Sequence, residues 1–214
     1  MIDGCLERIV ALPRGSRRIV AIAGPPGSGK STLADELCAA LTHRGTSAAV
    51  LPMDGFHYDD TILRARGLMP RKGSPETFDI DGLDHMLERL ARNDAPEVAV
   101  PVFDRTLEIA RNAARIIPQA TDILLAEGNY LLLDRPGWAG LARHFDLTIA
   151  LHEAPVVLHA RLMRRWCDLG LPETEAAAKV DGNDMPNGHA VLTKSRPADI
   201  TLTGSHSSAA APAP

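Results

Sequence analysis

The ten residues AGPPGSGKST at positions 23–32 constrain the fold of this 214-residue chain more than any other stretch. Residues 24–31 match G-x-x-x-x-G-K-[ST], a glycine-rich loop whose backbone amides and following helix bind phosphate groups. A strand-like apolar run precedes the motif directly and a helix-like run follows it. The alternative is a glycine-rich turn that merely starts a helix, but this context favours a phosphate loop in an α/β protein.

The two prolines restrict which amides of this loop can donate to phosphate. Pro25 and Pro26 lack an N–H, so they can only stiffen the entry to the loop and reduce the backbone entropy lost on binding. Lys30 is expected to pair with the β- and γ-phosphates, and the Ser31 hydroxyl is expected to coordinate Mg²⁺. The predicted nucleotide-binding residues are Gly24, Gly27, Ser28, Gly29, Lys30, Ser31 and Thr32.

Apolar runs rich in valine, isoleucine and leucine alternate with segments of helical period. This alternation predicts a parallel β-sheet flanked by helices on both faces. Strands are predicted at residues 18–23, 48–52, 123–126, 146–151 and 199–202. Helices are predicted at residues 31–43, 81–91, 138–144 and 155–169, and a small hairpin outside the main sheet at 97–120.

Length and composition favour one domain over residues 1–203, with a disordered low-complexity tail over 204–214. No apolar run reaches the roughly 18 residues of a membrane helix, and the N-terminus does not resemble a signal peptide, so a cytoplasmic protein is expected. The net charge of −4 argues against nucleic acid as a partner. Cys5, Cys38 and Cys167 are too few and too far apart for a disulfide framework or a metal site.

Two carboxylates follow predicted strands. Asp54 comes after residues 48–52 and Glu127 after residues 123–126. Ligands bind at the C-terminal ends of parallel strands, so Lys30, Asp54 and Glu127 are expected to line one crevice. There Asp54 would orient or deprotonate an acceptor hydroxyl, and Glu127 would hold Mg²⁺ directly or through water. A turn role for Asp54 and a capping or surface role for Glu127 remain open.

A GTPase would need the guanine-binding pattern N/T-K-x-D. The nearest string, TKSR at positions 193–196, has arginine where the acid is required. A kinase acting on a small molecule fits these residues better than a GTPase.

Five segments, in order, resemble one group of enzymes: AIAGPPGSGKST, LPMDGFHYDD, RKGSPETFDIDG, PVFDR and LLAEGNYLLLD. They are similar to the P-loop kinases that include uridine kinase, pantothenate kinase and phosphoribulokinase. The chain looks most like the bacterial branch named for fructose transport systems or as nucleoside/nucleotide kinase family proteins. The resemblance covers residues 18–202 and implies ATP as phosphoryl donor and a P-loop NTPase fold with a helical lid. Its motifs specify the superfamily rather than the substrate.

The resemblance also implies roles for individual residues. Asp54 matches the family's catalytic aspartate. The substrate-binding residues that it implies are Arg71, Asp79, Asp104 and Arg105, although Phe103 stands where the family has a tyrosine. Arg161, Arg164 and Arg165 are spaced to lie on one helical face and resemble the arginines of the lid helix, of which Arg164 and Arg165 are the predicted catalytic pair. A solvated basic face is the alternative. The segment that contains Asn183, Asp184, Pro186 and Asn187 also resembles this bacterial branch, but its residues suggest no physical role from sequence.

The sequence therefore predicts an ATP- and Mg²⁺-dependent kinase that phosphorylates a hydroxyl of a small metabolite, a sugar or a nucleoside. Two alternatives stay open. One is an ATP-binding regulator linked to a sugar transporter, with little or no phosphoryl transfer, and the other is an uncoupled ATPase. The acceptor and the oligomeric state are not specified, and a homodimer is compatible with the sequence.

Overall fold

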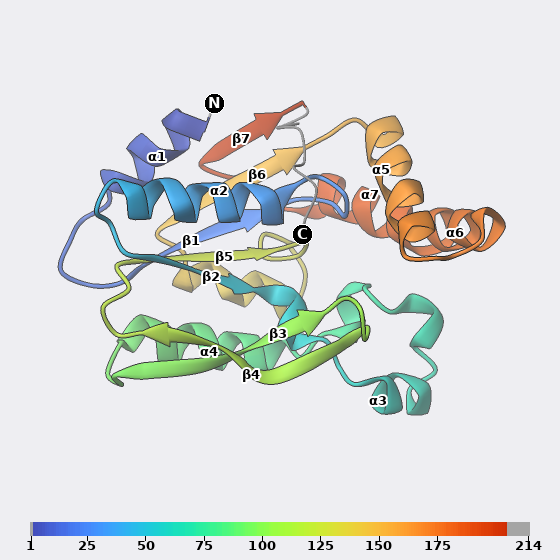
Figure 1. The fold of residues 1–214 in the computed structure, drawn as a ribbon, viewed down its shortest axis with the longest axis horizontal. Coiled ribbons are helices and arrows are strands. Elements are labelled where there is room, and N and C mark those ends of the chain that lie inside the picture. Colours follow the sequence, from blue (N-terminus) through green and yellow to red (C-terminus); the bar gives the residue numbers. More distant parts are fainter. Residues whose placement is uncertain (1, 205–214) are drawn as a thin grey trace.

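The computed structural model describes residues 2–204 and contains a five-stranded parallel sheet in the order β2-β5-β1-β6-β7 (Figure 1). The predicted parallel sheet is confirmed. In its central strand, β1, the burial of five of six residues explains why the sequence is a continuous apolar run. The strands are β1 (Arg18–Ala23), β2 (Ala48–Pro52), β5 (Ile123–Gly128), β6 (Leu147–His152) and β7 (Ile200–Thr203).

Helices cover both faces of this sheet, as predicted. One face packs against α2 and the amphipathic N-terminal helix α1, which buries Cys5, Leu6 and Ile9. The other face packs against α4, the 3₁₀ helix η4 and α7. The bounds are α1 (Ile2–Val10), α2 (Lys30–His43), α4 (Ile80–Arg92), η4 (Trp138–His144) and α7 (Met185–Lys194). All three cysteines are unpaired thiols.

The predicted hairpin is also confirmed. Strands β3 (Glu97–Asp104) and β4 (Ile109–Pro118) pair antiparallel in a sheet of their own. The hairpin packs on the 3₁₀ helix η1 (Met53–Phe56), where a Cβ on Gly55 would lie 2.5 Å from the carbonyl oxygen of Pro101. Glycine is required there because the two backbones approach so closely.

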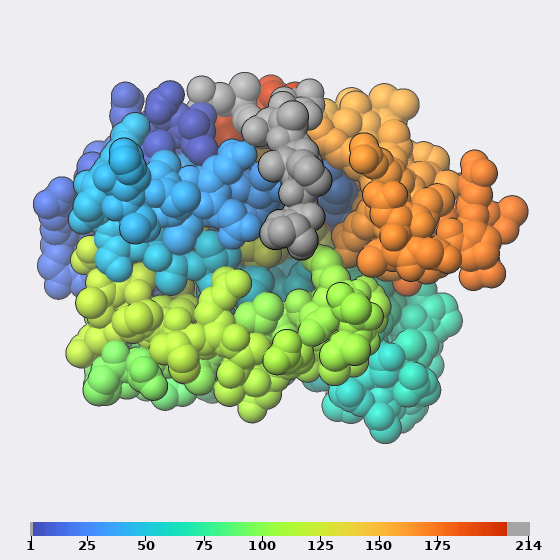
Figure 2. Space-filling view, in the orientation of Figure 1, coloured from blue at the N-terminus to red at the C-terminus, as the bar shows by residue number. Residues whose placement is uncertain are grey.

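Two segments beyond the sheet complete the fold. Residues 60–77 form α3 (Asp60–Ala65), η2 (Met69–Arg71) and η3 (Pro75–Thr77). The lid segment, residues 155–194, consists of α5 (Pro155–Asp168), α6 (Glu173–Lys179), the π-helix η5 (Val180–Asp184) and α7, of which the sequence predicted α5 alone. Figure 2 shows the orange lid segment meeting the green hairpin and the teal residues 60–77.

Within residues 2–204, no helix has the length and apolar character needed to cross a membrane. The predicted tail, apart from Gly204, lies outside the described residues.

Candidate active site

The phosphate loop joins β1 to α2 through two left-handed glycines. Gly27 and Gly29 have φ angles of 79° and 89°, a region in which only glycine is unstrained. Helix α2 begins at Lys30, so the first-turn amides have no intrahelical partner and can bind an anion. Gly24 and Ser28 are buried within the loop. The remaining predicted loop residues line an open cavity of about 520 Å³, the loop cavity: Gly27, Gly29, Lys30, Ser31 and Thr32.

The structure brings Lys30, Asp54 and Glu127 together at the C-terminal ends of three strands. The Ser31 hydroxyl donates to Oε2 of Glu127 at 3.2 Å, and Glu127 is 5% exposed. Asp54 sits beside Glu127 because Met53 packs directly on Gly128, where any Cβ would collide with the methionine side chain. The positions of Asp54 and Glu127 therefore depend on Gly55 and Gly128, the glycines that follow them and allow this close packing.

Opposing effects set the charge of these two acids. Burial raises the pKa of Asp54, but the positive charges of Arg105, His57 and Lys30 outweigh it, so the net pKa lies below its ordinary value. Burial dominates at Glu127 and raises its pKa, only partly opposed by Lys30. The pKa of the Lys30 amino group is lowered by burial, against the attraction of both acids.

A second cavity, the inner cavity, adjoins the loop cavity. Lys30, Arg105 and Arg165 line both of them. Nη2 of Arg105 donates to Oδ2 of Asp54 at 2.7 Å. Burial and the nearby Arg105 lower the pKa of Arg165, so two cations face each other where an anion would stabilise both. The inner cavity is also lined by Asp54, His57, Lys72, Phe78, Phe103, Glu108, Asn129, Trp166, Lys179 and Asp184.

The three arginines of α5 do not share one environment. Leu158, Leu162 and Trp166 define its buried face. At about 100° per residue, Arg165 lies beside that face and Arg164 lies nearly opposite it. The structure accordingly places Arg164 away from the site, with its side chain 85% exposed and 3.6 Å from Asp168. Arg161 instead donates to the carbonyl of Gly27 at 3.1 Å and supports the phosphate loop.

Arg71 does not line the inner cavity; it forms hydrogen bonds to the lid segment instead. Its guanidinium donates to the carbonyl of Gly182 at 3.1 Å and to Oδ1 of Asn187 at 3.2 Å. The buried amide of Asn187 donates to Asn183, whose own amide donates to the carbonyl of Lys72 at 2.7 Å. These contacts give Asn183 and Asn187 a structural role that the sequence did not reveal.

Asp79 and Asp104 likewise have local roles in this structure. Asp79 is the N-cap of α4 and accepts from the amide of Gly82 at 3.0 Å. Asp104 accepts from the amides of Thr106 and Leu107 in the hairpin turn and pairs with Arg111 at 3.3 Å. Of the four predicted substrate-binding residues, only Arg105 lines the inner cavity.

Sequence reasoning missed several residues of the inner cavity. Glu108, Asn129, Trp166 and Lys179 lie on four different elements or turns, and no motif connects them. The ring of His57, another residue of this cavity, contacts Phe78 and Phe103 with centroid distances of 3.9 and 4.9 Å.

The parallel sheet, the phosphate loop and the helices on both faces define a P-loop kinase fold. The model of the phosphoribulokinase / uridine kinase family matches residues 19–170, and the chain belongs to this family. Members of this family are ATP-dependent kinases that phosphorylate hydroxyl groups, and this chain is such a kinase.

Individual relatives cover most of the chain. The protein YggC of Escherichia coli (strain K12) is 36% identical over 87% of this chain and 77% of its own length. A candidate uridine kinase of Schizosaccharomyces pombe, C227.14, is 34% identical over 86% of this chain and 83% of its own. Among solved structures, a candidate fructose transport system kinase from Silicibacter sp. TM1040 is 40% identical, with a TM-score of 0.89 over 94% of this chain and 98% of that one.

Proposed function

We propose that this kinase transfers the γ-phosphoryl group of ATP, with Mg²⁺, to a hydroxyl of a small sugar or nucleoside. The observation that carries the proposal is the junction between the two cavities. Lys30, Arg105 and Arg165 line both cavities, so a phosphoryl group passing from one to the other would remain among cations. Such preorganised charges stabilise the transition state of phosphoryl transfer.

The phosphate loop would hold ATP through the amides of residues 27–32, with the Lys30 amino group on the β- and γ-phosphates. Arg165 lies on the lid segment and lines both cavities, so we propose that it contacts the phosphoryl group during transfer. Arg164 has no such position and is left out of the proposed mechanism.

Asp54 would align the acceptor. Its lowered pKa keeps the carboxylate ionised at neutral pH, so it accepts a hydrogen bond from the acceptor hydroxyl and holds the oxygen in line with the γ-phosphorus. As the new P–O bond forms, the bond from the γ-phosphorus to the leaving oxygen of ADP breaks. The hydroxyl proton passes to Asp54 and then to solvent.

Ser31 and Glu127 fit a magnesium ion. They are a hydroxyl and a carboxylate 3.2 Å apart, and they line one cavity together with Asp54. Mg²⁺ in kinases uses one or two protein oxygens, waters and the substrate phosphates, and Ser31 with Glu127 matches that donor set. When bound, the ion neutralises charge on the β- and γ-oxygens.

A transporter-linked regulator is the competing proposal, favoured by the name of the Silicibacter protein. The two are separated by measuring ADP formation from ATP and Mg²⁺ with D-fructose, other sugars, uridine, cytidine or pantothenate, each against a control without acceptor. The kinase proposal predicts at least about a tenfold stimulation by one acceptor, corresponding to about 1.4 kcal/mol of transition-state stabilisation. ATP binding with a flat panel would favour the regulator.

A further inference from the structure

We infer that the inner cavity selects a polyhydroxylated, non-aromatic acceptor, a sugar or related polyol rather than a nucleoside, and that Glu108 and Asn129 bind its hydroxyl groups. The inference rests on the proposed kinase function and narrows its substrate class. Four features of the inner cavity carry it: two buried oxygens without partners, a constrained backbone at the hairpin tip, aromatic rings already in contact with other side chains, and a small free volume.

The inner cavity contains unsatisfied hydrogen-bond acceptors. Among residues 2–204, Oε1 of Glu108 and Oδ1 of Asn129 are buried and lack a hydrogen-bond partner. Both side chains line the inner cavity. Buried polar atoms nearly always have partners, and an unpaired one is costly. A ligand that brings several hydroxyl donors would satisfy both oxygens.

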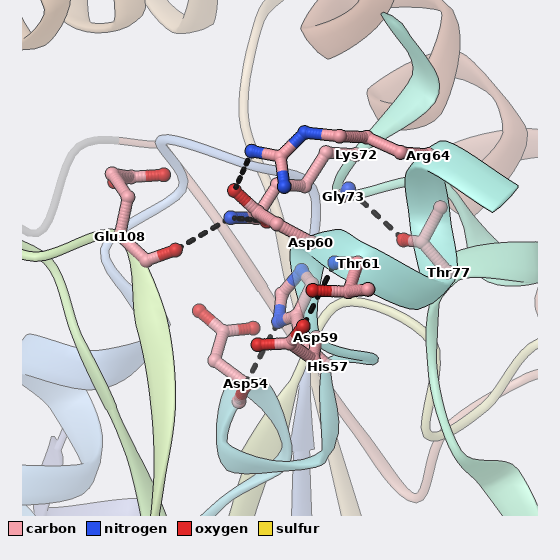
Figure 3. Close-up of polar contacts among 10 residues, drawn as sticks. All are labelled: Asp54, His57, Asp59, Asp60, Thr61, Arg64, Lys72, Gly73, Thr77 and Glu108. Carbon is pink, nitrogen blue, oxygen red and sulfur yellow. Dashed lines mark hydrogen bonds and ion pairs between the residues drawn. The ribbon is translucent and has the colours of Figure 1, made fainter. Parts of the chain in front are cut away.

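The backbone at Glu108 is constrained. Its φ of 54° lies in the left-handed region, which is uncommon for a glutamate. Nζ of Lys72 donates to the carbonyl of Glu108 at 2.5 Å and to Oδ1 of Asp60 at 2.7 Å (Figure 3). Strained backbone persists where the surroundings fix it, often at functional sites. Lys72 thus fixes the turn that carries the Glu108 carboxylate into the inner cavity.

The aromatic rings that line the inner cavity already contact other side chains, which limits the ring surface that a nucleobase could stack on. The ring of His57 lies between Phe78 and Phe103, tilted by 43° and 46° to them. Trp166 is 7% exposed, with Nζ of Lys179 3.8 Å from its ring centroid. Nucleobases gain affinity by stacking on free aromatic faces. The free volume of the inner cavity, about 80 Å³, is also much smaller than that of the loop cavity, which favours a compact acceptor.

The test is a set of kcat/KM measurements with ATP and Mg²⁺. D-ribose and uridine form a matched pair that differs by the base, and D-fructose and sorbitol extend the polyol arm. We expect a sugar or polyol to exceed both uridine and cytidine by at least about tenfold, as a fitted hydroxyl site allows. Higher kcat/KM for uridine than for every sugar and polyol would overturn the inference and leave the proposed kinase function intact. No turnover with any acceptor, with ATP bound, would overturn the kinase function itself, and this inference with it.

Variants then test Glu108 directly on the best acceptor. Glu108→Ala, and the size-preserving Glu108→Gln, should raise KM by about 10- to 100-fold and remove the discrimination against a deoxy analogue of that acceptor. Asn129→Ala should act in the same direction. Leu107→Ala, an exposed position in the same turn, is the matched control and should leave KM unchanged. An unchanged KM and unchanged deoxy discrimination in both Glu108 variants would contradict the assignment.

Discussion

Arg105 and Asp54 form an ion pair 2.7 Å long that joins the hairpin turn to the end of β2. The pair engages Oδ2 of the aspartate and helps keep its pKa below the ordinary value despite burial. The residue proposed to orient the acceptor thus owes part of its lowered pKa to a residue 51 positions further along the chain. The ion pair therefore links the hairpin to the residue that we propose to be catalytic.

Replacing Arg105 should move the pH dependence of the reaction. Without the guanidinium, the pKa of Asp54 rises, so the acidic limb of kcat/KM against pH shifts to higher pH in Arg105→Ala. Arg105→Lys keeps a positive charge and should show a smaller shift of the acidic limb than Arg105→Ala. Arg111→Ala, an exposed arginine of the same hairpin, serves as the control. An acidic limb that stays in place in Arg105→Ala would refute this coupling.

The two neighbouring lid arginines should behave differently. Arg165→Ala is expected to lower kcat by about 100-fold, the typical cost of removing one preorganised donor to the transition state. Arg164→Ala should leave kcat unchanged, because its side chain is in solvent. Steady-state kinetics of both variants test this difference. An equal decrease of kcat in the two variants would show that α5 presents another face to the active site during catalysis.

Gly55 should tolerate no side chain. In Gly55→Ala the new Cβ would press on the backbone of Pro101, and we expect a loss of about 1–3 kcal/mol in the free energy of unfolding. Gly4→Ala is the matched control: helix α1 leaves that position open, so a gain of up to about 1 kcal/mol is expected. Urea titrations measure both, and a Gly55→Ala protein as stable as wild type would argue against the close packing of η1 on β3.

Asp199 should contribute stability that depends on pH. Its carboxylate accepts from the amide and hydroxyl of Thr148 at 2.8 and 2.6 Å, and these hydrogen bonds lower its pKa. The contribution is complete above the unfolded pKa of about 3.9 and is lost as the pH falls through the lower folded value. The stability difference between wild type and Asp199→Asn should therefore be largest above pH ~5 and shrink below pH ~4. Urea titrations across this range that show a constant difference would contradict the assignment.

Much of the fold is predictable from sequence because its signals are local. The apolar run of β1, the glycines of the phosphate loop and the helical period of α2 lie next to one another, and each specifies its own conformation. The placement of Asp54 and Glu127 at the site was predictable because ligands bind at the C-terminal ends of parallel strands.

The rest depends on contacts between distant segments. The position of Glu108 depends on the hairpin turn and on Lys72, 36 residues away. The distinction between Arg164 and Arg165 depends on which face of α5 packs against α6, and the spacing of the arginines alone does not determine that. Asn183 could not be interpreted from sequence because its partner, the carbonyl of Lys72, is 111 residues away.

The proposed role of Asp54 in phosphoryl transfer is tested most directly in Asp54→Asn, by measuring transfer of a labelled γ-phosphoryl group to the best acceptor in a single turnover and ATP binding by calorimetry. Asp134→Asn, the same substitution at an exposed position, is the control. We expect transfer to fall by about 10²- to 10⁴-fold in Asp54→Asn, while ATP binding persists and the control is unchanged. Transfer at the wild-type rate in Asp54→Asn would contradict the proposed mechanism.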